Sequence, residues 1–285
     1  MPSNTGIVTE NLNRLALGLL IACAPLISSA KDAIPVLMYH QITDEKAPSE
    51  TVISPRRFAE QMSYLAEHKY TTVSMDELVA IMQGKMAMPA KPVHLSFDDG
   101  WKNVVAAIPI LDKLGFKASF WIITEAGADS PHLSWTQIID LAKNPRFEVQ
   151  SHTATHPWQY PHNTLQAWMQ GKTPGKGPDD VRSELERSKK MLEQKVGRPV
   201  DYLSWPLGLY NEEMIALAKD VGYKALLTTD NLPGNMVGGD IYRIHRLTIH
   251  GGCDLITFVQ QLADHVNRKC EEEARTLDIG TNLMR

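Results

Sequence analysis

Short apolar runs alternate with segments of helical periodicity along most of the chain. Strands are predicted at residues 35–39, 71–74, 93–97, 118–123, 147–150, 202–205, 225–229 and 242–248. Helices are predicted at residues 55–67, 75–83, 104–114, 134–142, 180–196, 212–220 and 254–269. This alternation is typical of βα units, so the pattern predicts an α/β fold.

Several of the predicted helices carry start or stop signals. Ser54 and Ser134 stand where a side-chain hydroxyl would cap a first turn. Gly115 and Gly222 follow two helix ends, where glycine is common. Residues 157–179, with four prolines and three glycines, break the alternation, and we expect them to form an excursion over the mouth of a barrel.

The composition is that of an ordinary globular protein. The 285 residues are 43% hydrophobic and 22% charged, with a net charge of −4. These values exclude a collagen, a coiled coil, a disulfide-stapled miniprotein and a wholly disordered chain. The slightly acidic balance offers no basic footprint for nucleic acid. The length allows two ordinary domains or one large α/β barrel.

Residues 1–30 have the pattern of a secretory signal. An apolar stretch at residues 15–27 follows Arg14, and its 13 residues are too few to span a bilayer, which takes about 20. We therefore predict cleavage after Ala30 and export to the periplasm or the extracellular space. A buried N-terminal helix and lipoprotein processing at Cys23 are the alternatives, and only the second would attach the chain to a membrane.

Beyond the signal, we expect one domain over residues 31–270 and a polar tail over residues 271–285. Cys253 and Cys270 would then lie in an oxidising compartment. If one helix separates them, 17 residues at about 1.5 Å each place the two cysteines about 25 Å apart. A disulfide needs Cα atoms within about 7 Å. We therefore predict no disulfide between them and no cysteine metal site.

Two adjacent carboxylates end the strand predicted at residues 93–97. Asp98 and Asp99 precede Gly100, and such a pair is costly after an apolar strand unless it is solvated, paired or bound to a cation. Neighbours in a strand point to opposite sides, so one carboxylate can bind a metal while the other faces a water. A capping Asp-Asp-Gly turn is the structural alternative.

Two histidines four residues apart follow the strand predicted at residues 147–150. His152 and His156 have the spacing of ligands on one face of a helical turn, although Pro157 prevents a regular helix from continuing. No glutamate follows His152, which excludes the His-Glu-x-x-His pattern of metalloproteases. Joined to an aspartate from another strand end, they form a set of two histidines and a carboxylate typical of a hydrolytic Zn²⁺ site.

Residues 96–100 (SFDDG) and 152–157 (HTATHP) resemble the first two motifs of the polysaccharide deacetylases, also called the NodB homology domain or carbohydrate esterase family 4. The resemblance spans about residues 34–262. It implies a single-domain, distorted (β/α)7 barrel with its active site at the carboxyl ends of the strands.

The resemblance also implies roles for individual residues. Asp99, His152 and His156 are similar to the family's metal ligands, and Asp98 is similar to its general base. The implied cofactor is a divalent metal, most readily Zn²⁺, although Co²⁺ and Ni²⁺ also accept imidazole and carboxylate ligands.

Residues 203–208 (LSWPLG) correspond to the family's third motif. Ser204 stands where many members have an arginine that orients the catalytic aspartate, so what positions Asp98 is an open question. The Trp-Pro-x-Gly form is similar to the branch of poly-β-1,6-N-acetylglucosamine deacetylases. Leu207 would donate its backbone N–H to an oxyanion, which requires no particular side chain.

Two histidines are candidates for the catalytic acid. His40 follows the first strand, as the acid does in that branch, and His250 lies in Leu247-Thr248-Ile249-His250, which is similar to the late Leu-x-His motif of other members. His250 lacks the aspartate that usually follows, so His40 is favoured. Trp205 and Trp158 are the candidates for stacking on sugar rings.

The activity that the resemblance implies is metal-assisted hydrolysis of N-acetyl groups on an N-acetylglucosamine polymer. A peptidoglycan or chitin-oligomer deacetylase and an O-acetyl esterase would use the same site. A catalytically silent carbohydrate-binding protein is the alternative from another class. We expect a glycan as the partner, no nucleic acid, and a monomer.

Overall fold

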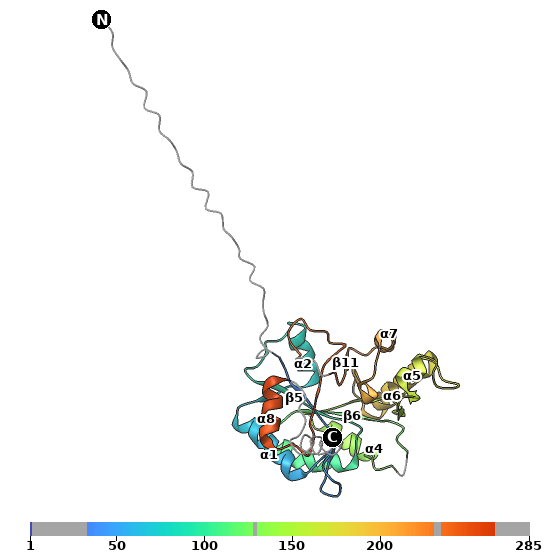
Figure 1. The fold of residues 1–285 in the computed structure, drawn as a ribbon, viewed down its shortest axis with the longest axis horizontal. Coiled ribbons are helices and arrows are strands. Elements are labelled where there is room, and N and C mark those ends of the chain that lie inside the picture. The colour runs from blue at the N-terminus through green and yellow to red at the C-terminus, as the bar shows by residue number, and fades with distance from the viewer. Residues whose placement is uncertain (2–32, 128–129, 231–234, 266–285) are drawn as a thin grey trace, which may run out of the picture.

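A curled, parallel sheet forms the centre of the protein (Figure 1). The computed structural model describes residues 1, 33–127, 130–230 and 235–265. The strand order is β11-β10-β7-β6-β5-β1-β12, with β4 paired to β5 beside this path. The strands are Val36–Tyr39 (β1), Thr71–Thr72 (β4), Pro92–Phe97 (β5), Ala118–Ile122 (β6), Phe147–Ser151 (β7), Tyr202–Ser204 (β10), Ala225–Leu227 (β11) and Leu247–Thr248 (β12).

The two ends of this sheet approach each other through the segment before β12. Ile244 forms a parallel bridge to Leu227, and its amide donates to the Leu226 carbonyl at 3.0 Å. β12 also pairs with β1, so residues 244–248 connect β11, at one end of the strand order, to β1 near the other end. The structure is the distorted (β/α) barrel that the resemblance implies, and the strand predicted at residues 242–248 is confirmed only at its carboxyl end.

Helices surround the labelled strands in Figure 1. They are Pro55–Glu67 (α1), Met75–Met82 (α2), Ile108–Leu114 (α3), Trp135–Lys143 (α4), Leu165–Met169 (α5), Pro178–Val196 (α6), Glu212–Val221 (α7) and Leu255–Asp264 (α8), with 3₁₀ helices at Lys102–Ala107 and Pro206–Gly208. The predicted caps are confirmed, because Ser54 accepts from the Arg57 amide and Ser134 forms a capping box with Gln137. Among the described residues, none of the helices combines the length and apolarity that a membrane span requires.

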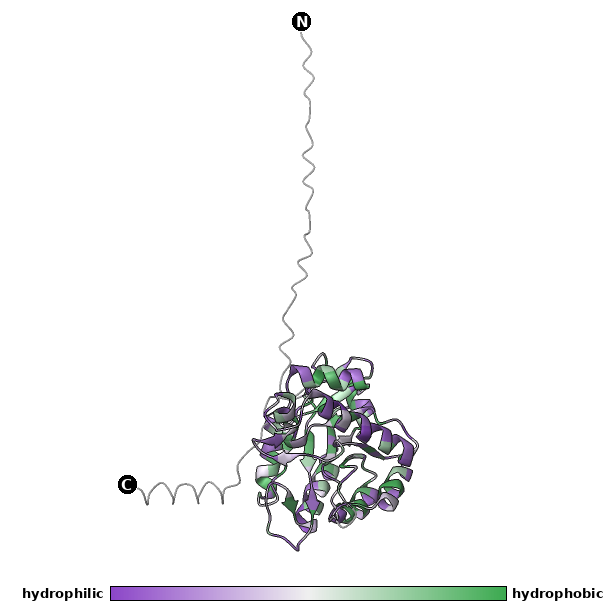
Figure 2. Cartoon of the chain, turned by 90° about the vertical axis from the view of Figure 1, so that its right-hand side faces the viewer, coloured by the Kyte–Doolittle hydropathy of each residue, from purple (hydrophilic) through white to green (hydrophobic). Residues whose placement is uncertain are grey.

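The α-helices bury apolar residues in the core. In α1 the buried positions are Phe58, Gln61, Met62 and Leu65, which follow the helical period. Figure 2 shows hydrophobic and hydrophilic positions alternating along the helices in this way. The core lies between these helix faces and the sheet, and the strand ends remain for polar residues.

Two predicted helices differ from the structure. Residues 104–114 divide between Ala107 and Ile108 into a 3₁₀ helix and α3. Pro109 lies in the first turn of α3, and its nitrogen cannot donate the hydrogen bond of a continuous helix. The helix predicted to reach residue 269 ends at Asp264, where His265 adopts a left-handed conformation with φ 57°.

The prediction that Cys253 and Cys270 form no disulfide with each other stays a prediction, because Cys270 lies outside the described residues. Cys253 itself is disulfide-bonded. Cys23, residues 2–30 of the predicted signal and the tail at residues 271–285 lie outside the described residues as well.

Two pairs of very short strands flank the sheet. Gln41–Ile42 (β2) and Val52–Ile53 (β3) pair in parallel, whereas Trp158–Gln159 (β8) and Asn163–Thr164 (β9) form an antiparallel hairpin. The hairpin and α5 lie within residues 157–179, where the sequence predicts an excursion from the barrel. The first residue of the hairpin, Trp158, lies beside the site described next.

Candidate active site

The register of β1 and β5 places two candidate residues at neighbouring strand ends. Tyr39 pairs with Phe97, so the residues that follow them, His40 and Asp98, leave the sheet together. The Asp98 amide donates to the Tyr39 carbonyl at 2.9 Å, which extends the ladder by one bond. The two side chains therefore line the same cavity at the carboxyl edge of the sheet.

The register of β7 and β10 adds His152. Leu203 pairs with Ser151, so His152 follows β7 next to Ser204. The Nδ1 atom of His152 lies 2.8 Å from the Ser204 carbonyl, which can only accept, so Nδ1 carries the proton of this bond. Its Nε2 atom is then left to face Asp99 and to act as a metal ligand.

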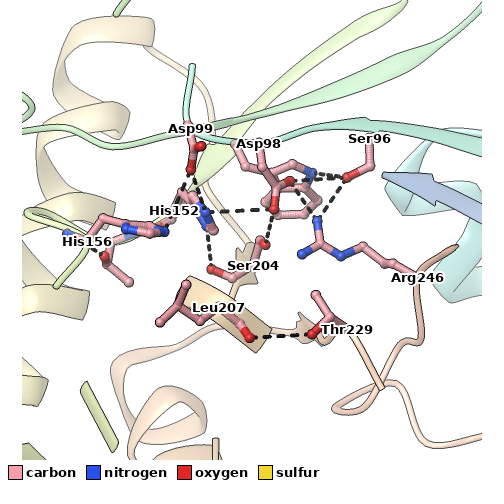
Figure 3. A network of polar contacts seen from close by, with 12 residues as sticks. Ser96, Asp98, Asp99, His152, His156, Ser204, Leu207, Thr229 and Arg246 are labelled. Atoms are coloured by element: carbon pink, nitrogen blue, oxygen red, sulfur yellow. Dashed lines mark hydrogen bonds and ion pairs between the residues drawn. The ribbon is translucent and has the colours of Figure 1, made fainter. Parts of the chain in front are cut away.

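Asp99, His152 and His156 form one cluster, as their spacing predicts. Their ligand atoms all lie within 4.8 Å of one another. The Asp99 Oδ1 atom is 3.2 Å from His152 Nε2 and 3.7 Å from His156 Nε2 (Figure 3). Two imidazoles and a carboxylate at this separation fit one divalent cation with coordination positions left open.

Electrostatics in this cluster keep the carboxylate charged. Burial alone would raise the pKa of Asp99, but its hydrogen bond with His152 and the nearby histidines hold that pKa far below its usual range. Burial lowers the pKa of His156 to about 4, so this imidazole is neutral at pH 7. A charged carboxylate and a neutral imidazole are the forms that bind a metal.

The loops that carry the cluster use left-handed backbone conformations. Asp99, Thr153, His156 and Leu207 have φ values of 69°, 68°, 50° and 58°. Such angles are uncommon for residues other than glycine and concentrate at functional sites. The interpretation of the two histidines as one face of a helical turn is wrong, because an irregular loop with two left-handed residues brings them together.

The second motif loop is fixed from behind by α6. Glu184 is buried, accepts from the Thr155 amide at 2.7 Å and the Thr155 hydroxyl at 3.0 Å, and pairs with Arg187 at 2.8 Å. This carboxylate satisfies polar groups of the loop between the two histidines. No sequence motif signals Glu184, because it lies 29 residues beyond Thr155.

Arg246 is the residue that holds Asp98 in position. It is 1% exposed, and its Nη1 atom donates to Asp98 Oδ1 at 2.6 Å (Figure 3). The same guanidinium donates to Ser96 Oγ and to the Thr228 carbonyl, each at 3.1 Å. Ser204 donates to the other Asp98 oxygen at 3.2 Å. The third motif lacks an arginine, but Arg246, in the segment that closes the barrel, contacts Asp98 instead.

The environment of Asp98 keeps it ionised despite its burial. Burial would raise the pKa of this carboxyl, but Arg246, followed by His152 and His40, holds it below the ordinary value. The Asp98 Oδ2 atom lies 3.7 Å from His152 Nε2. The structure therefore holds an ionised, buried carboxylate in a fixed orientation beside the metal-type cluster.

The structure places the two candidate acids differently. His40 lines a cavity of about 300 Å³ together with Asp98, Asp99 and Leu207. Burial lowers the pKa of His40 although the charges of Asp98 and Asp99 oppose this effect. His250 does not line this cavity, and its Nδ1 atom accepts from the Gly252 amide at 2.9 Å.

The two tryptophans also differ. Trp158 is 64% exposed and lines a second cavity beside Asp99. Trp205 is 0% exposed, so it has no open ring face for a sugar and the prediction that it stacks on one is wrong. The position of Trp205 in the third motif does not indicate that this residue is buried.

A parallel barrel with a polar cluster of two histidines and a carboxylate at its strand ends, and a fixed aspartate beside them, defines a hydrolase site. Comparison with known proteins places the chain within that class. The family model for polysaccharide deacetylase matches residues 85–226, a range that includes both motifs and Leu207. The chain belongs to the polysaccharide deacetylase family and is a hydrolase of that family.

Individual relatives agree with this assignment. The Bacillus subtilis protein YxkH, whose name places it among polysaccharide deacetylases, is 27% identical over 220 residues, covering 77% of this chain and 72% of that protein. Poly-β-1,6-N-acetyl-D-glucosamine N-deacetylase of Escherichia coli is 24% identical over 280 residues, covering 85% of this chain but 40% of that enzyme. The structure of the Streptococcus pyogenes deacetylase PplD shares the fold, with a TM-score of 0.69 at 24% identity, over 81% of this chain and 98% of that one.

Proposed function

We propose that this protein is a metal-dependent deacetylase that removes N-acetyl groups from an N-acetylglucosamine polymer. The observation that carries the proposal is the position of Asp98, buried and held by Arg246 next to the cluster of Asp99, His152 and His156. Hydrolysis of an unactivated amide requires a base beside such a cluster. Relatives in Escherichia coli and Staphylococcus aureus that are named poly-β-1,6-N-acetyl-D-glucosamine N-deacetylases support the choice of polymer.

Asp99, His152 and His156 would hold the metal, and Zn²⁺, Co²⁺ and Ni²⁺ are all compatible with these ligands. When bound, such an ion polarises the acetyl carbonyl and lowers the pKa of a water. The bond from His152 Nδ1 to the Ser204 carbonyl orients this imidazole for the task before any metal arrives.

The remaining steps belong to the protein's own groups. Asp98 takes a proton from the attacking water, with one carboxylate oxygen held by Arg246 and the other by Ser204. The backbone N–H of Leu207, a residue that lines the same cavity, donates to the oxyanion. His40, in the protonated form that the charges of Asp98 and Asp99 favour and burial opposes, gives its proton to the leaving nitrogen as the C–N bond breaks, because an amine anion is too poor a leaving group. The products are acetate and a free amine on the sugar.

The test of this proposal is the Asp98→Asn variant. We expect it to retain the wild-type metal content while acetate release falls by at least about 10²-fold, since general base catalysis contributes about 10²–10⁴-fold. Acetate is measured with poly-β-1,6-N-acetylglucosamine, chitin oligomers, peptidoglycan and an O-acetylated xylan, with added Zn²⁺, Co²⁺ or Ni²⁺ and with a chelator. Undiminished turnover by Asp98→Asn would remove Asp98 from the mechanism, and an O-acetyl preference would redirect the proposal to an esterase.

The proposal includes export, because the polymer would be encountered outside the cytoplasm, and a monomeric enzyme. Mass spectrometry of the purified native protein should give an N-terminus after Ala30. A diacylated N-terminus at Cys23 would instead establish a lipoprotein held at a membrane.

A further inference from the structure

The side chain of Trp101 folds back onto Asp99, two residues before it in the sequence. The indole N–H of Trp101, which can only donate, forms a hydrogen bond to Asp99 Oδ2 at 2.8 Å. Asp99 and the intervening Gly100 both have φ 69°, so two consecutive left-handed residues turn the chain sharply after β5. This turn brings the indole and the carboxylate together.

The two oxygens of Asp99 have different partners. Oδ2 accepts from Trp101, whereas Oδ1 lies 3.2 Å from His152 Nε2 and 3.7 Å from His156 Nε2 (Figure 3). A carboxylate without the indole contact could rotate about its Cβ–Cγ bond and present either oxygen, or both, to the imidazoles. The hydrogen bond from Trp101 therefore selects Oδ1 as the oxygen that faces them.

Trp101 is itself fixed by contacts that do not involve Asp99. Its ring stacks on His132, with centroids 4.4 Å apart and planes 25° from parallel, and the two residues also form an antiparallel bridge. The Leu133 amide donates to the Gly100 carbonyl at 2.8 Å, which ties the turn to the same segment. The Lys46 Nζ atom lies 5.2 Å from the centroid of the indole. The indole is thus a fixed donor that Asp99 must meet.

We propose that Trp101 is a positioning residue for the metal site, because its indole N–H holds Asp99 Oδ2 and leaves Oδ1 alone to join the two imidazoles as a ligand. This inference rests on the metal dependence in the proposed function. A carboxylate limited to one ligand oxygen takes one coordination position, which leaves others open for water and the acetyl carbonyl. Outer hydrogen bonds of this kind orient metal ligands before a metal binds.

Trp101→Phe removes the N–H and keeps an aromatic ring against His132. We expect it to weaken Zn²⁺ binding about 10–100-fold, the usual effect of losing a hydrogen bond to a metal ligand. Trp168→Phe is the matched control. Trp168 is 5% exposed, and its indole N–H donates to Asn163 at 2.7 Å, outside the metal-type cluster. The same atoms and an equivalent bond are lost there, so Zn²⁺ affinity should stay at the wild-type value.

The first measurement is competition of each metal-free protein with a chromophoric chelator for Zn²⁺, together with its Tm. The inference predicts weaker Zn²⁺ binding by Trp101→Phe at a Tm close to that of Trp168→Phe. Equal Zn²⁺ affinity of Trp101→Phe and the wild type, or equal weakening in both variants, would overturn it. A wild type that binds no Zn²⁺ would overturn it together with the metal dependence.

A second measurement keeps the inference testable even if Trp101→Phe does not fold. NMR of the tryptophan indole N–H groups compares the metal-free wild type with Asp99→Ala. Loss of the acceptor should move the Trp101 indole proton upfield and leave the Trp168 indole proton where it is. An unchanged Trp101 signal would show that the hydrogen bond to Asp99 is not formed in solution.

Neither measurement requires turnover, so this inference and the proposed function fail separately. If Trp101→Phe weakens Zn²⁺ binding while the wild type releases no acetate from any substrate, the positioning role stands and the deacetylase proposal ends. If the wild type releases acetate and Trp101→Phe binds Zn²⁺ as tightly as it does, the deacetylase proposal stands and the positioning role ends.

Discussion

Asp98 is held by side chains that lie far apart in the sequence. Ser204 is 106 residues away and Arg246 is 148 residues away, yet each donates to one of its carboxylate oxygens. The motif around Asp98 predicts the base itself, because two carboxylates after an apolar strand form a local pattern. It cannot predict Arg246, because that contact depends on how the last strand closes the barrel. In the sequence, Arg246 is a single arginine that precedes the apolar residues of the closing strand, and nothing there indicates a contact with Asp98.

Arg246→Lys tests whether this guanidinium positions the base. Lysine keeps the charge but cannot hold Asp98, Ser96 and the Thr228 carbonyl with one planar group. We expect kcat to fall about 10–100-fold, as for other residues that orient a catalytic group, with KM within about 2-fold and unchanged metal content. Steady-state kinetics and metal analysis measure this.

Arg57→Lys is the control for that substitution. Arg57 also donates to two backbone carbonyls, those of Gly251 and Cys253, but it does not contact Asp98. Its replacement should leave kcat at the wild-type value. Arg246→Lys with wild-type kcat, or with lost metal, would show that Arg246 does not act through the orientation of Asp98.

His40 and His250 give a second prediction at the residue scale. His40→Ala should lower kcat about 10²–10⁴-fold, because the leaving nitrogen loses its proton donor. His250→Ala should retain most of the activity, since His250 lies outside the cavity that contains Asp98. Acetate release by the two variants is compared at equal metal loading. The opposite order of activities would make His250 the acid.

At the scale of elements, local chemistry predicts the structure well where side chains define a boundary. The bounds of α1 are those predicted, because Ser54 caps it and a proline opens it. Prediction fails at the end of α8, where His265 adopts a left-handed conformation, and for strands of two residues such as β8, which are too short to show alternation.

The third motif depends on a glycine for its shape. Gly208 has φ 66°, and a Cβ there would lie 2.8 Å from the Thr229 Cβ and closer still to the Thr229 hydroxyl. Gly208→Ala should therefore destabilise the protein by more than the 1–2 kcal/mol, roughly, of a left-handed alanine alone. It should also lower kcat, because the neighbouring Leu207 amide moves. Urea unfolding and acetate release measure the two effects.

Gly115→Ala provides the comparison for Gly208→Ala. Gly115 has a similar φ of 67° at the end of α3, but nothing lies within 4 Å of an added Cβ. It should show only the backbone cost and keep wild-type kcat. Equal destabilisation of the two variants would mean that the Thr229 contact relaxes without cost.

At the scale of the whole molecule, one barrel edge assembles the site. His40 follows β1, the two aspartates follow β5, the histidines follow β7, and Arg246 lies in the closing segment. The sequence predicts that these groups meet, because parallel strands end at the same edge. It does not give the left-handed turns that aim them, since those follow from packing between loops.

Because the proposed metal ligands follow β5 and β7, a bound metal should stabilise the whole barrel. A ligand that binds only the folded state at 100 times its dissociation constant adds about 2.7 kcal/mol. For a domain of this size, 1 kcal/mol raises Tm by about 2–4 °C, so chelator-treated protein should gain about 5–10 °C on addition of Zn²⁺. His156→Ala should lose most of this gain, whereas Asp98→Asn should keep it, because Asp98 stands beside the cluster and outside the ligand set. Differential scanning calorimetry decides between these outcomes, and an equal gain in His156→Ala would place the metal elsewhere.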